Sequence, residues 1–251
     1  MKKTLATILA MILVLSLFTV ASAEAGKYGV AVPNATNSFY ATCISGVEEG
    51  VKEYDAECSV IVTDAGFDSG KQLDQVNDLI SQGCKAIVLI PVDSNSILPA
   101  IDECKAAGIP VFVMDTPAGE NDGVIATVTA DNYSAGEIAG SALIKAIGGK
   151  GKVAMLRYAE GSASTAEREQ GFVDAIAEAK GIELVSSNQY GGATTETAYK
   201  ASENLLAPLK TADGLSINGI FACNESTTFG MLRALQDANL AGKVTFIGFD
   251  S

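Results

Sequence analysis

The sequence has no histidine and no tryptophan among its 251 residues, and only 17 lysines and arginines against 30 aspartates and glutamates. Histidine is the commonest general base and belongs to most nucleophilic triads and many zinc sites, so its absence disfavours those catalytic classes. The formal net charge of -13 disfavours nucleic acid as a partner, because phosphate binding needs clustered basic side chains. We therefore expect no catalytic residue, no metal, no cofactor and no nucleic-acid partner.

Cysteine is also scarce, and its spacing fits no zinc-binding pattern. Cys84 precedes an expected strand and Cys104 lies near the end of the following helix, so a disulfide between them is one alternative. We favour separately buried thiols, since a small thiol packs well in an apolar core. The five cysteines are Cys43, Cys58, Cys84, Cys104 and Cys223.

The N-terminus has the pattern of an export signal. Lys2 and Lys3 precede an uncharged apolar stretch from Leu5 to Val20, and the small residues 21–23 (Ala-Ser-Ala) follow. The pattern predicts a signal peptide over residues 1–23, cleavage after Ala23, and a periplasmic or extracellular protein. A membrane anchor is the alternative, but no basic stop-transfer flank follows the apolar stretch.

Short β-branched runs alternate with longer amphipathic segments along the rest of the chain. For example, the run Lys27 to Val32 precedes an expected helix from Ser38 to Tyr54, and the run "GIFAC" precedes one from Thr227 to Ala238. This alternation predicts βαβ units, and the nearly continuous apolar strands predict parallel sheets covered on both faces. The series restarts after residues 130–132. We predict an α/β fold with two doubly wound parallel-sheet lobes, residues 24–131 and 132–251. A capping box of Ser164 and Glu167 predicts where one helix of the second lobe begins.

Polar residues follow nearly every expected strand. Ligands of open α/β sheets bind outside the carboxyl ends of the strands, so these side chains are expected to converge on one mouth per lobe. For any single one, a role as turn former or helix N-cap is the stronger interpretation. The strand-end residues are Asn34, Asn37, Asp93, Asp115, Asn224, Glu225 and Asp250.

The residue types at these strand ends suit a neutral polyol. Arginine donates in a fixed fork, carboxylates accept twice and asparagine does both, while aromatic faces cover the C–H surface of a sugar ring. A hydrolase built on Asp93 and Asp115 is disfavoured, because Asp115 opposite Arg168 is expected to stay ionised. The predicted ligand residues are Asn37, Phe39, Tyr40, Asp115, Arg168, Asn224, Phe249 and Asp250.

Seven stretches together resemble the type I periplasmic binding proteins for sugars, the ribose-, galactose- and allose-binding group related to the lactose-repressor effector domains. They are "NATNSFYATCISGVEEG", "GCKAIVLIPVDS", "IPVFVMD", "TADNYSAGEIAG", "STAEREQGF", "FACNESTTFGMLRAL" and "TFIGFD". The resemblance implies a monomer whose lobes close over one small ligand and present it to an ATP-binding cassette permease. A sensor that presents a sugar or signal to a chemoreceptor or membrane kinase is the alternative, with the same capture chemistry.

The chain departs from the ribose-binding pattern in three places. Ile90 stands where those members have a polar residue, and Thr116 stands where they have arginine. An aromatic expected near Tyr190 to Thr194 cannot be placed. A hexose, polyol or inositol is therefore as open as a pentose. Family members also return to complete the first lobe, so ending at Ser251 indicates a C-terminally incomplete copy, which we favour, or a shortened protein with an open sheet edge.

Overall fold

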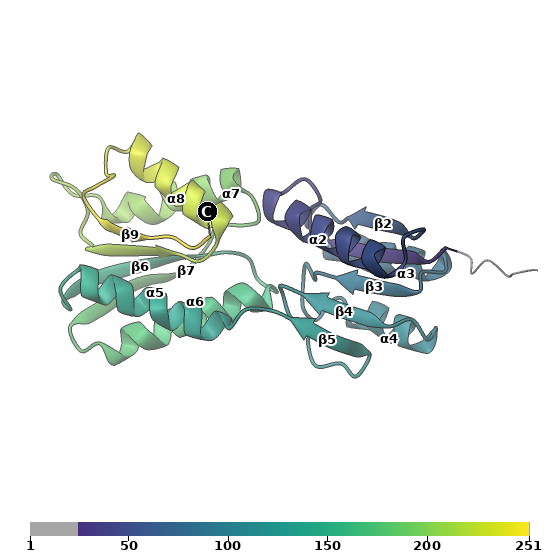
Figure 1. Ribbon diagram of the computed structural model, residues 1–251. Coiled ribbons are helices and arrows are strands. Elements are labelled where there is room, and N and C mark those ends of the chain that lie inside the picture. The colour runs from purple at the N-terminus through teal and green to yellow at the C-terminus, as the bar shows by residue number, and fades with distance from the viewer. Residues whose placement is uncertain (1–24, 251) are drawn as a thin grey trace, which may run out of the picture.

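The computed structural model describes residues 25–250, which form two lobes, each built on a parallel sheet (Figure 1). The predicted α/β class with two parallel-sheet lobes is confirmed. The predicted signal peptide and its cleavage site after Ala23 lie outside the described residues. The lobe boundary between residues 131 and 132 stays a prediction.

The first sheet has the strand order β2-β1-β3-β4-β5, and every neighbouring pair is parallel. Helices α3 and α4 pack on one face, and α2 packs on the other over β1 and β2. The elements are β1 (Lys27–Val32), α2 (Ser38–Tyr54), β2 (Ser59–Asp64), α3 (Ser69–Ser81), β3 (Ala86–Leu89), α4 (Leu98–Ala106), β4 (Val111–Met114) and β5 (Val124–Val128).

The second sheet has the order β7-β6-β8-β9 and is also parallel throughout. Helices α5 and α6 cover one face and α7 and α8 the other, as Figure 1 shows. The elements are α5 (Asn132–Ala146), β6 (Gly151–Arg157), α6 (Ala163–Glu178), β7 (Ile182–Tyr190), α7 (Thr195–Leu206), the 3-10 turn η1 (Ala207–Leu209), β8 (Gly219–Ala222), α8 (Glu225–Asp237) and β9 (Thr245–Ile247).

Alternating side chains of the central strands fill two cores on opposite faces of each sheet. Val30 and Val32 are fully buried on the α2 face, and Ala31 is buried on the α3 and α4 face. The prediction that both faces are covered is wrong for β5. Ile125 and Val128 there are 63% and 69% exposed, because β5 is an edge strand of this sheet and α2 lies over β1 and β2 instead.

Glycines let α5 and α6 pack with their backbones close together. A Cβ on Gly136 would overlap the backbone of Arg168, and a Cβ on Gly171 would overlap the carbonyl oxygen of Tyr133. A Cβ on Gly140 would overlap the Cβ of Ala175. Only glycine allows this approach, and it fixes where α6 presents Arg168.

Two helix starts differ from the prediction. The capping box of Ser164 and Glu167 is wrong: α6 begins at Ala163 after Ser162, and no side chain caps it. The Ser164 hydroxyl is instead hydrogen-bonded to Thr116 of the first lobe. Helix α8 begins two residues before Thr227, because Asn224 and Thr227 form a reciprocal capping box.

All five cysteines are free thiols, and Cys84 and Cys104 are buried separately as we favoured. Between residues 25 and 250, no helix combines the length and apolar character that crossing a membrane would require.

Candidate ligand-binding site

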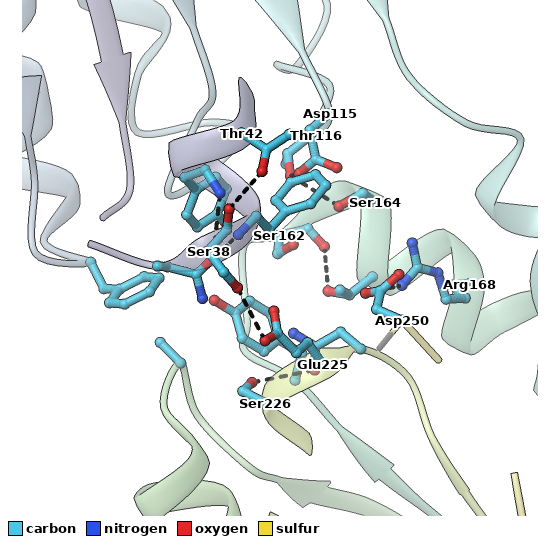
Figure 2. Close-up of a pocket in the computed structure, with 18 residues that line it drawn as sticks. Ser38, Thr42, Asp115, Thr116, Ser162, Ser164, Arg168, Glu225, Ser226 and Asp250 are labelled. Carbon is cyan, nitrogen blue, oxygen red and sulfur yellow. Dashed lines mark hydrogen bonds and ion pairs between the residues drawn. The ribbon is translucent and has the colours of Figure 1, made fainter. Parts of the chain in front are cut away.

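A cavity of about 480 Å³ lies between the two lobes, at the carboxyl ends of both sheets. This volume falls within the range of small-molecule sites. Figure 2 shows that side chains from both lobes point into it. The lining residues are Asn37, Ser38, Phe39, Tyr40, Thr42, Phe67, Asp115, Thr116, Tyr158, Ser162, Ser164, Thr165, Arg168, Ala193, Asn224, Glu225, Ser226 and Asp250.

The structure brings seven of the eight predicted ligand residues to this cavity. The exception is Phe249, which lies beneath the Arg168 guanidinium with 3.5 Å between the guanidinium carbon and the ring centre. The first lobe supplies Asn37, Phe39, Tyr40 and Asp115, and the second supplies Arg168, Asn224 and Asp250.

Both predicted asparagines are also helix N-caps. The Asn37 Oδ1 atom accepts from the backbone N–H groups of Phe39 and Tyr40 at the start of α2. The Asn224 Oδ1 atom accepts from the N–H and hydroxyl of Thr227 at the start of α8. Each Oδ1 is therefore engaged, and the side-chain NH₂ is the part left to donate to a ligand.

Asp115 and Asp250 adopt the same unusual backbone conformation in the two lobes. Each directly follows the end region of a strand, with φ of 63° and 64°. Aspartate tolerates this left-handed region better than most residues, but the conformation still needs support from its surroundings. At Asp115 the backbone N–H donates to the carbonyl of Val128 (2.8 Å), and its own carbonyl accepts from the Thr129 hydroxyl (2.5 Å).

The Asp115 carboxylate lies in a poorly solvated part of the cavity. Burial raises the pKa of Asp115 above its ordinary value, although the Thr116 hydroxyl at 3.0 Å and the charge of Arg168 act in the opposite direction. Burial thus opposes the ionised form that we expected from the sequence. A ligand hydroxyl that donates to this carboxylate would replace the lost water.

Arg168 is 7% exposed, and its guanidinium donates hydrogen bonds to other groups of the protein. Its Nη1 donates to the carbonyl of Cys223 (2.6 Å) and lies 3.7 Å from Asp250 Oδ2, and its Nη2 donates to Asn132 Oδ1 (2.7 Å). Figure 2 shows Arg168 and Asp250 side by side at the cavity wall. The buried Nε–H has no protein partner. Arg168 therefore links α5, α6 and β8 and orients Asp250.

A buried network behind the cavity supports the second lobe's wall. The carboxylate of Glu169 pairs with Arg157 (2.6 Å) and accepts from the backbone N–H of Tyr158 (2.9 Å) and the thiol of Cys223 (3.3 Å). These bonds fix the chain where β6 ends, which positions the Tyr158 side chain at the cavity.

Sequence reasoning missed most of the hydroxyl groups of the cavity. Tyr158 directly follows β6, so it lies at the carboxyl end of a strand, where ligands of open α/β sheets bind. A tyrosine after an apolar run is, however, easily assigned to the strand itself. The Tyr158 phenol and that of Tyr40 in the first lobe both line the cavity and lie close enough for each to shift the pKa of the other. Burial raises the pKa of Tyr158 to about 12. Ser38, Thr42, Ser162, Ser164, Thr165 and Ser226 had no pattern to mark them.

The departures from the ribose-binding pattern divide between cavity and core. Thr116 lines the cavity, whereas Ile90 is fully buried in the first lobe's core. Within residues 190–194, Ala193 lines the cavity. The Tyr190 ring instead lies near Arg157, with 5.8 Å between the ring centre and the guanidinium carbon. No aromatic of this segment lines the wall.

Two strand-end residues serve turns instead of the cavity. Asn34 Oδ1 accepts from the backbone N–H groups of Thr36 and Asn37. Asp93 Oδ1 accepts from those of Asn95 (2.9 Å) and Ser96 (2.7 Å). Here the turn-forming interpretation holds.

Residues 28–251 match the family described as periplasmic binding protein domain. The chain belongs to this family. A ribose import binding protein of Bacillus subtilis is 34% identical over 223 residues, which cover 88% of this chain and 68% of the relative. A D-apiose import binding protein of Paraburkholderia graminis is 27% identical over 238 residues, which cover 94% of this chain and 73% of that relative.

A protein of known structure has the same arrangement. It is an ABC transporter solute-binding protein from Agrobacterium vitis with bound D-fucose, with a TM-score of 0.81 and 28% identity over 90% of this chain and 77% of that one. The expected family and fold are thus confirmed. These relatives are named as binding proteins and not as enzymes, so the hydrolase alternative has no support.

Proposed function

We propose that this periplasmic binding protein captures a neutral sugar or polyol and delivers it to an ATP-binding cassette permease. The observation that carries the proposal is the interlobe cavity, which joins carboxylates, amides and hydroxyls with the aromatic rings of Phe39, Tyr40 and Phe67. The relatives named above, which bind or import ribose, D-apiose and D-fucose, support the same ligand class.

The charges around the cavity favour a neutral ligand. Asp115, Glu225 and Asp250 supply three carboxylates, whereas Arg168 is the one guanidinium among the lining residues and already faces Asp250. Vicinal hydroxyls can donate to a carboxylate in pairs, while a phosphate or carboxylate on the ligand would meet like charge. We propose Asn37, Phe39, Tyr40, Asp115, Arg168, Asn224 and Asp250 as ligand contacts, with Phe249 supporting Arg168.

Binding between two lobes implies capture by closure. A ligand that contacts both lobes stabilises the closed arrangement by its extra affinity for that state. We further propose export with cleavage after Ala23, a periplasmic or extracellular location, and action as a monomer. A sensor that presents its ligand to a chemoreceptor or membrane kinase would use the same cavity; an adjacent permease and ATPase gene pair favours import over sensing.

The experiment is a dye-reported thermal melt of residues 24–251 with pentoses, hexoses, polyols and inositols. A ligand at a hundred times its dissociation constant adds about 2.7 kcal/mol, which raises the melting temperature by several degrees. Sugar phosphates and sugar acids are the matched controls, and we expect no shift from them. A cooperative melt that no neutral sugar or polyol moves would contradict the proposal.

A further inference from the structure

One short segment of the second lobe makes contact with three separate parts of the first. This closure loop, residues 158–164, runs from the end of β6 into the first turn of α6. The Gly161 carbonyl accepts from the backbone N–H of Ser94 at 2.9 Å, and the Ser164 hydroxyl shares a 2.9 Å hydrogen bond with the hydroxyl of Thr116. At the third, Tyr158 lies near Tyr40 in the cavity wall.

Ser94, one first-lobe partner of the closure loop, is itself held by hydrogen bonds within the first lobe. Ser94 is 7% exposed; its hydroxyl donates to the Pro117 carbonyl (2.6 Å) and its own carbonyl accepts from the N–H of Gly119 (2.7 Å). These bonds tie the end region of β3 to the turn after β4. The closure loop therefore docks on a surface that is already fixed within the first lobe.

Gly161 brings the backbone of the closure loop against Asp93 of the first lobe. It has a φ of 87°, and a Cβ built there would overlap the carboxylate of Asp93. That carboxylate cannot easily swing away, because its other oxygen accepts from two backbone N–H groups, those of Asn95 and Ser96. A side chain at residue 161 would thus hold the lobes apart on this side of the cavity.

The opposite side of the cavity has a weaker bridge. There the Ser38 hydroxyl and Glu225 carboxylate lie 3.4 Å apart and are solvent-exposed. Exposed pairs of this length contribute little. The free energy of lobe contact is therefore concentrated at the closure loop, next to Thr116, Tyr158 and Ser164 of the cavity wall.

We infer that the closure loop is the positioning element that sets how easily the lobes close, and that Gly161 against Asp93 limits which residue can stand there. The loop acts on ligand affinity through the closed arrangement, so this part of the inference rests on the proposed function. If only a fraction of molecules can close, the apparent dissociation constant rises in inverse proportion to that fraction.

The first test needs no ligand affinity. Exchange of the Ser94 amide, followed by NMR, is compared in wild type, Gly161→Ala and Gly148→Ala, each with and without the sugar that shifts the melt most. Gly148 is the matched control, since it has a φ of 74° in the same lobe with nothing near its Cβ position. We expect faster Ser94 exchange in Gly161→Ala alone.

The second test measures affinity by calorimetry with D-ribose, D-fucose, D-allose and myo-inositol as probes. Gly161→Ala should weaken the probe that binds by about tenfold or more, while Gly148→Ala leaves it within about twofold. Adding Asp93→Ala to Gly161→Ala removes the carboxylate in the way and should recover part of the loss, although Asp93→Ala alone gains nothing. Rescue of this kind would not follow from a general loss of stability.

The outcomes separate the inference from the proposed function. Equal Ser94 exchange in Gly161→Ala and Gly148→Ala, or affinity unchanged by Gly161→Ala, overturns the closure-loop inference even if sugars bind. If no probe binds any variant, the proposed function fails, and the exchange comparison without sugar still decides the role of Gly161. A cooperative melt of each variant, required first, shows that both lobes are folded.

Discussion

The guanidinium carbon of Arg168 lies 3.5 Å from the centre of the Phe249 ring, so that the charged plane rests on an aromatic face. Phe249 is itself fixed, because its N–H and carbonyl both bond the hydroxyl of Thr228. The strand end of β9 thus supports Arg168 from below and places Asp250 beside it.

Replacing Phe249 by leucine should weaken ligand binding without unfolding the protein. The variant loses the cation–π contact, worth about 0.5 to 2 kcal/mol, and leaves Arg168 freer to move. Calorimetry with the bound sugar measures the loss. Phe229→Leu is the control, since Phe229 is 45% exposed on α8 and outside the cavity. Equal affinities of the two variants would contradict a supporting role for Phe249.

Asp115→Asn should stabilise the free protein at neutral pH. Burial raises the pKa of Asp115 in the folded state, so the ionised form is relatively unfavourable there. Its contribution to stability is complete below the ordinary pKa of 3.8 and is lost as the pH rises through the raised folded value. Asparagine also accepts the positive φ. The variant should melt at a higher temperature than wild type at pH 7, and this difference should shrink as the pH is lowered to 3.5.

The same substitution should weaken sugar binding. An amide has one accepting oxygen and no charge, whereas a carboxylate has two accepting oxygens and a charge, and breaking a buried charged hydrogen-bonding set costs about 2 to 5 kcal/mol. A gain in stability with a loss of affinity is expected of a residue that serves binding and not folding. If the variant binds as well as wild type, Asp115 is not a ligand contact.

Gly171→Ala should destabilise the second lobe. Its added methyl would overlap the Tyr133 carbonyl and push α5 from α6, which costs about 1 to 3 kcal/mol. Gly46→Ala in α2 is the matched control, because nothing lies near its Cβ and alanine favours a helix by about 0.5 to 1 kcal/mol. Urea denaturation should therefore move the two midpoints in opposite directions. Two similar midpoints would mean that the helices can separate without cost.

The thiols should fall into two groups by their accessibility to a thiol reagent. Cys84, Cys104 and Cys223 are buried, and burial raises the pKa of all three. A thiol reagent at pH 8 should leave them unmodified in the native protein and label all five cysteines after denaturation without reductant. Only three labelled thiols after denaturation would indicate a disulfide.

The fold was accessible from the sequence because each strand and helix has a local pattern. The predicted run Lys27 to Val32 coincides with β1, and Ser38 to Tyr54 coincides with α2, where Asn37 caps the start. The expected burial of both sheet faces failed at β5, because the position of an edge depends on strand order and not on the residues of that strand.

The cavity was accessible only in part. The strand-end rule brought Asp115, Asn224 and Asp250 to it, because parallel strands point their carboxyl ends the same way. Asp93 also follows a strand but forms a turn and does not line the cavity, whereas Tyr158 lines the cavity and was not predicted. Contacts between the lobes, such as Thr116 with Ser164, join residues 48 positions apart and have no local pattern.

The separation of the two sheets along the chain has a consequence for biosynthesis. Between residues 25 and 250, the strands of the first sheet all end by Val128 and those of the second begin at Gly151. As the chain emerges with its N-terminus first, these strands of the first sheet are all available before any strand of the second, and domains generally fold as units. The cavity needs side chains from both lobes, so it can form only after the strands of the second sheet have appeared.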